Sequence, residues 1–116
     1  MQKKLGPDLK KVIQNTRKKR FSPQTALKIG IQLIQRFKEL HEIGWLHLDL
    51  KPNNIVLSSG NFKSPESSTV ALIDFGISKS YLTPSLHHVK METGAAFAGN
   101  FLFASVNAFN HLTQSR

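Results

Sequence analysis

The chain has 116 residues, the length of one small domain. Hydrophobic residues make up 40% of it and charged residues 20%, a composition typical of a globular core and not of a disordered tail. It contains no cysteine, which excludes disulfides, thiolate zinc sites and a cysteine nucleophile and fits a reducing compartment, so we expect a cytoplasmic or nuclear protein. Sixteen Lys and Arg against seven Asp and Glu give a net charge of +9, which suits a phosphate-bearing or acidic partner. We expect no membrane contact, because no apolar run reaches the roughly 20 residues of a membrane span and no signal peptide is recognisable.

The first 20 residues predict a short helix followed by a basic loop. Asp8 can cap a helix whose apolar stripe is Leu9, Val12 and Ile13. The cluster Arg17-Lys18-Lys19-Arg20 then offers a surface to nucleic acid, an acidic substrate or an acidic partner. A solvated loop is the simpler interpretation, and nucleic acid is disfavoured, because no aromatic interleaving or nucleic-acid motif accompanies the cluster.

The strongest helical pattern covers residues 23–43. Ser22 is a good N-cap residue and Pro23 suits the first helical position. Apolar residues recur at steps of three and four, and others widen the stripe: Ala26, Ile29, Leu33, Phe37 and Leu40, then Leu27, Ile31 and Ile34. A stripe this wide predicts burial on more than one side, and Gly44 predicts the end of the helix.

Two short strands are predicted after this helix. The runs Ile55-Val56-Leu57 and Val70-Ala71-Leu72-Ile73 are apolar and contain β-branched residues. Residues 58–68 between them are turn-forming and predict a hairpin connection. From Gly76 onward the sequence predicts an irregular segment.

The most informative segment is His47-Leu48-Asp49-Leu50-Lys51-Pro52-Asn53-Asn54. Asp49 and Lys51 are two residues apart, so in an extended loop their side chains point the same way, and Asn54 follows shortly after. A carboxylate, an ammonium and an amide oxygen can thus converge on one site. Phosphoryl transfer requires such a set, because the aspartate accepts the hydroxyl proton, the lysine offsets phosphoryl charge and the asparagine binds magnesium.

Asp74-Phe75-Gly76 ends the second predicted strand. The carboxylate is placed for a second magnesium contact, and the glycine permits an unusual turn. Alone, this tripeptide is more simply a strand end. The compound pattern is more specific, because His-x-Asp-Leu-Lys-Pro-x-Asn lies between a helix and a strand, and a second strand precedes Asp-Phe-Gly, as kinase motifs require.

These motifs resemble the C-terminal lobe of a eukaryotic protein kinase, and more narrowly the casein kinase I family. The matching segments are Leu5-Gly6-Pro7, Phe21-Ser22, residues 47–54, Ile73-Asp74-Phe75-Gly76, Ala104-Ser105-Val106-Asn107 and Gln114-Ser115-Arg116. The fifth is the most specific, since that family has Ser-Ile-Asn where most kinases have Ala-Pro-Glu. The resemblance covers residues 1–116 and implies an α+β, protein-kinase-like fold, a partial C-terminal lobe that is mainly helical with a short β-hairpin and an activation segment. The N-lobe and the later C-lobe helices are expected to be absent.

The resemblance also implies cofactors and roles. ATP and Mg²⁺ are the expected cofactors, with Asp49 as catalytic base and Lys51 as the phosphate-side lysine. Asn54 and Asp74 are the implied metal ligands. Asp8 sits where the family places polar groups near the nucleotide ribose, although helix capping explains Asp8 equally well.

The sequence departs from the family at several positions. The arginine of His-Arg-Asp is Leu48, so control through a phosphorylated activation segment is not expected. Asn100 replaces a threonine that supports the catalytic aspartate, and Leu102 replaces an arginine that helps bind phosphate on primed substrates. His47 is expected to be structural, packing beneath Phe75.

The favoured function is a serine/threonine protein kinase that transfers the ATP γ-phosphate to protein substrates, acidic ones among them. Lys51 favours Ser/Thr over Tyr specificity. The alternatives are a catalytically incompetent, pseudokinase-like scaffold and a small basic nucleic-acid binder. Because the Gly-rich loop, the strand lysine and its partner glutamate are not in this sequence, we expect the chain alone to be inactive. Because the later large-lobe helices that would cover the apolar helix of residues 23–43 are not in it either, we expect the chain alone to be unstable.

Two further groups carry weaker signals. His87-His88 suggests a metal site, but adjacent histidines in a strand point oppositely and no third ligand stands at useful spacing. Four phenylalanines suggest an interaction patch: Phe97, Phe101, Phe103 and Phe109. We expect them instead to pack the substrate-binding loop onto helices that this chain lacks.

Overall fold

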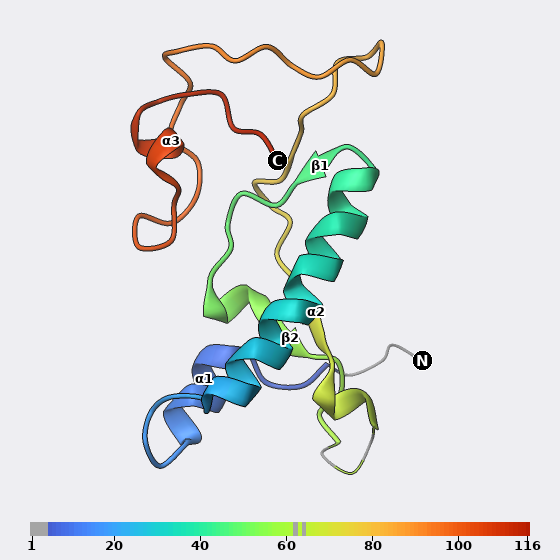
Figure 1. Ribbon diagram of the computed structural model, residues 1–116, viewed down its shortest axis with the longest axis vertical. Coiled ribbons are helices and arrows are strands. Elements are labelled where there is room, and N and C mark those ends of the chain that lie inside the picture. The colour runs from blue at the N-terminus through green and yellow to red at the C-terminus, as the bar shows by residue number, and fades with distance from the viewer. Residues whose placement is uncertain (1–4, 62, 64) are drawn as a thin grey trace. The chain divides into compact units, whose positions relative to one another are not determined.

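The computed structural model describes residues 5–61, 63 and 65–116. The chain divides into two compact units, and Figure 1 colours it by residue number. The hairpin unit comprises the chain up to Phe37 together with Pro52–Ile73, and the catalytic-loop unit comprises Lys38–Lys51 with Asp74–Arg116. Among the described residues, no helix is both long and apolar enough to cross a membrane.

Two helices form as their capping residues predict. Helix α1 (Leu9–Asn15) begins after Asp8, whose Oδ1 accepts a hydrogen bond from Lys11 N at 2.9 Å. Helix α2 (Pro23–Glu42) begins after Ser22, whose Oγ accepts from Thr25 N at 3.2 Å. The helix ends one residue before the predicted end, and Gly44 takes φ of 84°, a conformation that glycine adopts at little cost.

The predicted hairpin is present. Strand β2 (Ile55–Leu57) pairs antiparallel with β3 (Val70–Leu72), with Val56 opposite Ala71. The second strand is one residue shorter than predicted. The connection contains an unpredicted 3₁₀ turn, η2 (Pro65–Ser68), and another, η1 (Pro52–Asn54), precedes β2.

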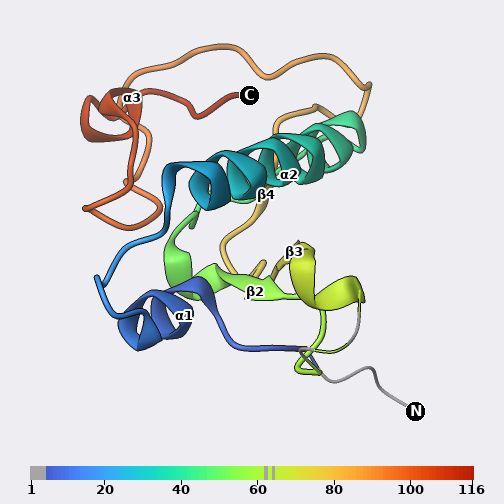
Figure 2. The same ribbon diagram turned by 60° about the horizontal axis from the view of Figure 1, so that its bottom comes forward.

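The core of the hairpin unit joins its helices to the strand pair. Leu9, Ile55 and Val70 are buried, and partly buried residues pack against them: Phe21, Ile29, Leu33, Leu57 and Leu72. Figure 2 shows α1, β2 and β3 on one side of α2. The side chains that widen the stripe of α2 are 58–73% exposed: Leu27, Ile31 and Ile34. The described residues therefore do not themselves supply the burial on several sides that the stripe predicts, which agrees with the expectation that its packing partners are absent from this chain.

The catalytic-loop unit contains short elements that the sequence did not reveal. Strand β1 (Trp45–Leu46) pairs antiparallel with β4 (Lys79–Ser80). Tyr81 follows β4 and its hydroxyl donates to His41 O at 2.5 Å. Helix α3 (Val106–Phe109) begins after Ser105, whose side chain accepts from Ala108 N. The prediction that the segment after Gly76 is irregular is therefore only partly right.

Three of the four C-terminal phenylalanines contact one another. The rings of Phe97 and Phe101 stack at 4.5 Å and 8°, and Phe109 lies 5.5 Å and 6.1 Å from them. Aromatic pairs at these separations are mutually stabilising. Phe103 takes no part in this stack and is half-exposed.

Candidate active site

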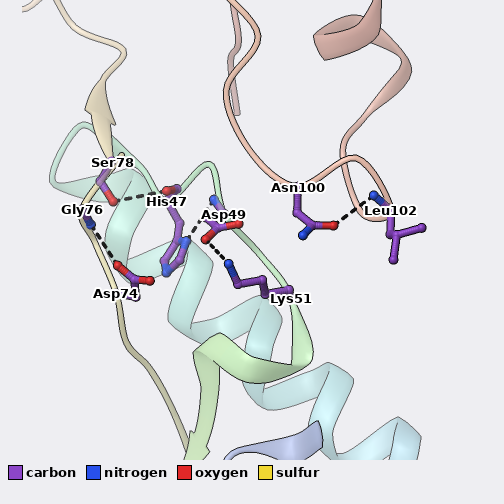
Figure 3. A network of polar contacts seen from close by, with 8 residues as sticks. All are labelled: His47, Asp49, Lys51, Asp74, Gly76, Ser78, Asn100 and Leu102. Carbon is purple, nitrogen blue, oxygen red and sulfur yellow. Dashed lines mark hydrogen bonds and ion pairs between the residues drawn. The ribbon is translucent and has the colours of Figure 1, made fainter.

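His47 organises the loop that follows β1. Its side chain is 2% exposed, and its ring packs on Phe75 with centroids 4.9 Å apart. Its Nδ1 accepts a hydrogen bond from Asp49 N at 3.2 Å, and its carbonyl accepts from Ser78 Oγ at 3.2 Å (Figure 3). The structure thus shows the predicted packing of His47 on Phe75. It also shows a hydrogen bond from the backbone of Asp49 to the His47 ring, which the sequence did not predict.

The residue between His47 and Asp49 has a left-handed backbone conformation. Leu48 has φ of 65°, a conformation that costs a residue with a Cβ roughly 1–2 kcal/mol. Such strain persists only where the surrounding structure imposes it, and it is common at functional sites. The bend at Leu48 is what allows the backbone amide of Asp49 to reach back to the His47 ring.

Asp49 and Lys51 form the charged pair of the site. Lys51 Nζ donates to Asp49 Oδ2 at 2.6 Å, and the two side chains are 26% exposed for Lys51 and 13% for Asp49. The prediction that these side chains point the same way is confirmed (Figure 3). Because the pair is partly shielded from solvent, its attraction is stronger than that of a surface ion pair.

Asp74 lies in the same unit, one residue before the ring that packs on His47. It has φ of 63°, and its Oδ1 accepts a long hydrogen bond from Gly76 N at 3.4 Å. The carboxylate is exposed, and no described cation pairs with it. A hard oxygen donor of this kind fits magnesium, which prefers carboxylate and carbonyl oxygens.

The other two candidate residues belong to the hairpin unit. Asn54 ends η1, is 4% exposed, and its backbone carbonyl accepts from Ile73 N at 3.0 Å. Its side-chain amide oxygen is also a ligand type that magnesium accepts. Asn54 thus anchors the residue that directly precedes Asp74 in the chain, a role that the sequence motif did not indicate.

Asp8 serves first as a helix cap. Its Oδ1 accepts from Lys11 N, and its Oδ2 lies 3.4 Å from Lys11 Nζ. The backbone N–H of Lys11 is the main cause that lowers the pKa of the Asp8 carboxyl below its ordinary value. The capping role is therefore confirmed, whereas a role near a nucleotide ribose stays a prediction.

Gly99 was not singled out as a functional position in the sequence. It has φ of 119°, and a Cβ built on it would lie 2.6 Å from Leu48 O. The next residue, Asn100, accepts a hydrogen bond on Oδ1 from Leu102 N at 3.0 Å (Figure 3). The segment around Gly99 therefore lies against the residue that precedes Asp49, and the glycine within an aromatic-rich run was the only sequence signal.

The two adjacent histidines are engaged in local contacts. His87 Nδ1 lies 3.1 Å from Ser85 Oγ, and His88 Nε2 lies 2.9 Å from Ser115 Oγ. Across the described ranges, no three His, Cys, Asp or Glu side chains gather in a group that could hold a metal ion. These histidines therefore support the loop after β4 and the C-terminal residues.

Sequence comparison with known proteins places this chain in a family. The sequence pattern of the protein kinase domain matches residues 2–98, a range that includes all five candidate site residues. The chain is 33% identical over 110 residues to serine/threonine-protein kinase spe-6 of Caenorhabditis elegans, and the match covers 95% of this chain and 28% of that relative. The chain thus spans less than a third of the length of this curated relative. With most of its residues matched, the chain belongs to the protein kinase domain family.

Proposed function

We propose that this chain is the catalytic-loop part of a serine/threonine protein kinase of casein kinase I type, which transfers the γ-phosphoryl group of ATP to protein hydroxyls. The observation that carries the proposal is the 2.6 Å pair between Asp49 and Lys51, on a backbone that His47 holds. Ala104-Ser105-Val106-Asn107 supports the casein kinase I type. The similarity to a serine/threonine kinase supports the hydroxyl specificity.

The side chains suggest a division of labour. Asp49 would orient the substrate hydroxyl and accept its proton as the oxygen attacks phosphorus. Lys51 pairs with the Asp49 carboxylate and would offset charge on the phosphoryl oxygens during the reaction. The bond from Asp49 N to His47 fixes the loop, so the carboxylate needs little rearrangement when substrate binds.

Two residues are suited to hold magnesium. Asp74 and Asn54 present a carboxylate and an amide oxygen, the donor types that magnesium uses in phosphoryl-transfer sites together with phosphate oxygens. ATP with magnesium supplies the transferable group and neutralises its charge. We propose protein substrates, acidic ones among them, and a cytoplasmic or nuclear setting.

The test is phosphate transfer by the full-length protein that carries this segment. Asp49→Asn keeps the shape but removes the base, so we expect kcat to fall about 10²–10⁴-fold with magnesium-ATP and a casein-type substrate. Glu42→Gln is the matched control, because it removes the same charge from an exposed position at the end of α2. Equal activity of the Asp49 variant and the control would contradict the proposal.

A second readout separates the kinase from the scaffold alternative. Calorimetric titration of the unaltered protein measures magnesium-ATP binding without turnover. Binding without transfer to any Ser or Thr peptide would favour the pseudokinase-like scaffold.

A further inference from the structure

The loop between α1 and α2 concentrates positive charge in the hairpin unit. Its four consecutive basic residues are all exposed: Arg17, Lys18, Lys19 and Arg20. At physiological salt the screening length is about 8 Å, so neighbouring cations in one short loop act on a ligand together. The cluster is a quarter of the sixteen Lys and Arg side chains, which makes this loop a major local source of the +9 charge.

The loop is held in shape by hydrogen bonds to Thr16. Thr16 O accepts from Lys19 N at 3.1 Å, which closes a turn with Arg17 and Lys18 at its centre. Thr16 Oγ1 donates to Ile13 O at 2.8 Å and accepts from Arg20 N at 3.1 Å. A preformed loop loses less conformational freedom when it binds a partner than a disordered segment would.

The positive charge of this loop has no acidic partner within the described residues. Asp8, Glu42 and Asp49 pair with other lysines, and none of the four loop cations forms an ion pair with a described carboxylate. Lys19 Nζ instead donates to Gln14 O. Helix α2 begins three residues after Arg20 and has no acid in its first turn, so the positive end of its dipole adds to the same potential.

The side chains around the cluster decide which polyanion fits. Phe21, the neighbouring aromatic residue, packs against the core of the hairpin unit, so it is not free to stack on bases. Single-stranded nucleic acid is normally held by stacked aromatics as well as by charge, and lipid surfaces by an inserted apolar residue. The loop offers cations alone, which fits carboxylates spaced along a flexible polypeptide.

We propose that the loop of residues 16–20 is a docking site for an acidic polypeptide segment rich in Asp and Glu. The site lies in the hairpin unit, whereas Asp49 and Lys51 lie in the catalytic-loop unit. Binding at this loop needs no phosphate transfer, so the inference is tested independently of the proposed function.

The test is fluorescence anisotropy with the full-length protein and a labelled decapeptide of Asp and Glu. The triple variant Arg17→Gln, Lys18→Gln and Arg20→Gln keeps Lys19, which bonds the loop to Gln14. We expect it to bind about tenfold more weakly, since three exposed ion pairs of modest strength are lost. The matched control removes three exposed charges elsewhere, Lys28→Gln, Lys38→Gln and Lys90→Gln, and should bind within about twofold of the unaltered protein.

Measurements on the unaltered protein test the proposal even if the triple variant does not fold. Its affinity for the acidic decapeptide should exceed that for an Asn and Gln decapeptide and should fall steeply with salt. Arg17→Lys with Arg20→Lys keeps the charge and should keep the affinity. Equal binding of the acidic and neutral peptides, equal loss in both triple variants, or tighter binding to a DNA decamer or to phosphatidylserine vesicles would overturn the proposal.

Discussion

Leu48 and Asp74 share an uncommon backbone conformation, with φ of 65° and 63°. Each adjoins one ring of the packed pair, since Leu48 follows His47 and Asp74 precedes Phe75. Aspartate tolerates this conformation, but leucine does so only under constraint. The ring contact and the bond from Ser78 to His47 O supply that constraint, so the candidate metal ligand and the catalytic loop depend on the same packing.

The contact between Gly99 and Leu48 gives a prediction about catalysis. Gly99→Ala places a methyl group 2.6 Å from Leu48 O, so the segment around Gly99 or the loop before Asp49 must shift. When reacting groups are misplaced by about 1 Å, the reaction can slow by about 10²-fold. We therefore expect kcat of the variant to fall by about 10- to 100-fold. The measurement is steady-state kinase activity of the full-length variant.

Gly94→Ala is the matched control for this change. Gly94 also has a positive φ, of 80°, but a Cβ there meets no atom within 4 Å. The substitution therefore introduces similar backbone strain without the clash. If both variants lost activity equally, strain rather than the contact with Leu48 would be the cause.

The cap on α1 gives a prediction about pH. The pKa of Asp8 is lowered in the folded chain, chiefly by the backbone N–H of Lys11, so the unfolded state binds the proton more readily. The stability that this carboxylate supplies is therefore present above about pH 4 and is lost as pH falls through the lowered pKa. Asp8→Ala should lower the free energy that stabilises helix α1 by about 1 kcal/mol at neutral pH and by less near pH 3.

Amide hydrogen exchange of α1 checks this prediction locally, and Asp8→Asn is the control. Asparagine caps helices about as well as aspartate but does not titrate. Protection of α1 in the Asn variant should therefore be close to that of the unaltered chain at neutral pH and should not fall on acidification. A pH dependence unchanged in Asp8→Asn would rule out Asp8 as its source.

At the scale of elements, Gln32 ties α2 to the hairpin. Its Oε1 accepts from Val70 N at 2.9 Å, and its Nε2 donates to Ser68 O at 3.1 Å. One side chain thus satisfies two backbone groups, one at the end of η2 and one at the start of β3. In the sequence, Gln32 is only a polar residue between apolar positions of the helix, and nothing there indicates this role.

Truncating Gln32 should open this join. Gln32→Ala leaves the Val70 N–H without its partner, and an unsatisfied, partly buried backbone group costs about 1–3 kcal/mol. We expect faster hydrogen exchange at Val70. Gln35→Ala makes the same substitution at an exposed position of the same helix and should leave that exchange rate unchanged. Equal exchange rates in both variants would count against the tie.

The elements that sequence predicted are those with a local signal. Helices α1 and α2 have capping residues and apolar periodicity, and β2 and β3 have apolar β-branched runs around turn-forming residues. Strands β1 and β4 have two residues each and pair across more than thirty positions, which no local pattern encodes. Helix α3, with four residues, is too short to show periodicity.

In the candidate site, too, the features set by neighbouring residues could be predicted and the contacts between distant segments could not. The pairing of Asp49 with Lys51 was predictable because alternation over two residues determines it. The ring contact of His47 followed from the kinase resemblance rather than from spacing. The approach of Gly99 to Leu48 joins segments about fifty residues apart, so it could be learned only from the folded chain.

At the scale of the molecule, one face of α2 is a source of exposed apolar surface. Leu27, Ile31 and Ile34 expose adjoining apolar surface on one helix, and none of the described residues buries it. Contiguous exposed apolar surface favours self-association. We therefore expect the chain of residues 1–116 to associate with rising concentration, and sedimentation velocity measures this.

Polar substitution on this face should reduce that association. Ile31→Gln with Ile34→Gln removes two of the three side chains while keeping helix-compatible residues. Leu86→Gln with Met91→Gln is the control, because these two residues are 78% and 76% exposed outside any helix. Association that persisted in the α2 variant but vanished in the control would assign the contact to the loop after β4 instead.

Trp45 is the only tryptophan of the chain, and it lies on β1, paired with Ser80 of β4. It is 45% exposed and stands two residues before His47. Intrinsic fluorescence of the indole therefore reports on the catalytic-loop unit, to which Trp45 belongs. Unlabelled protein thus carries its own optical probe two residues before His47. Tryptophan emission can follow unfolding or rearrangement of the β1–β4 pair. Circular dichroism, to which α2 contributes most, can follow the long helix in the same sample.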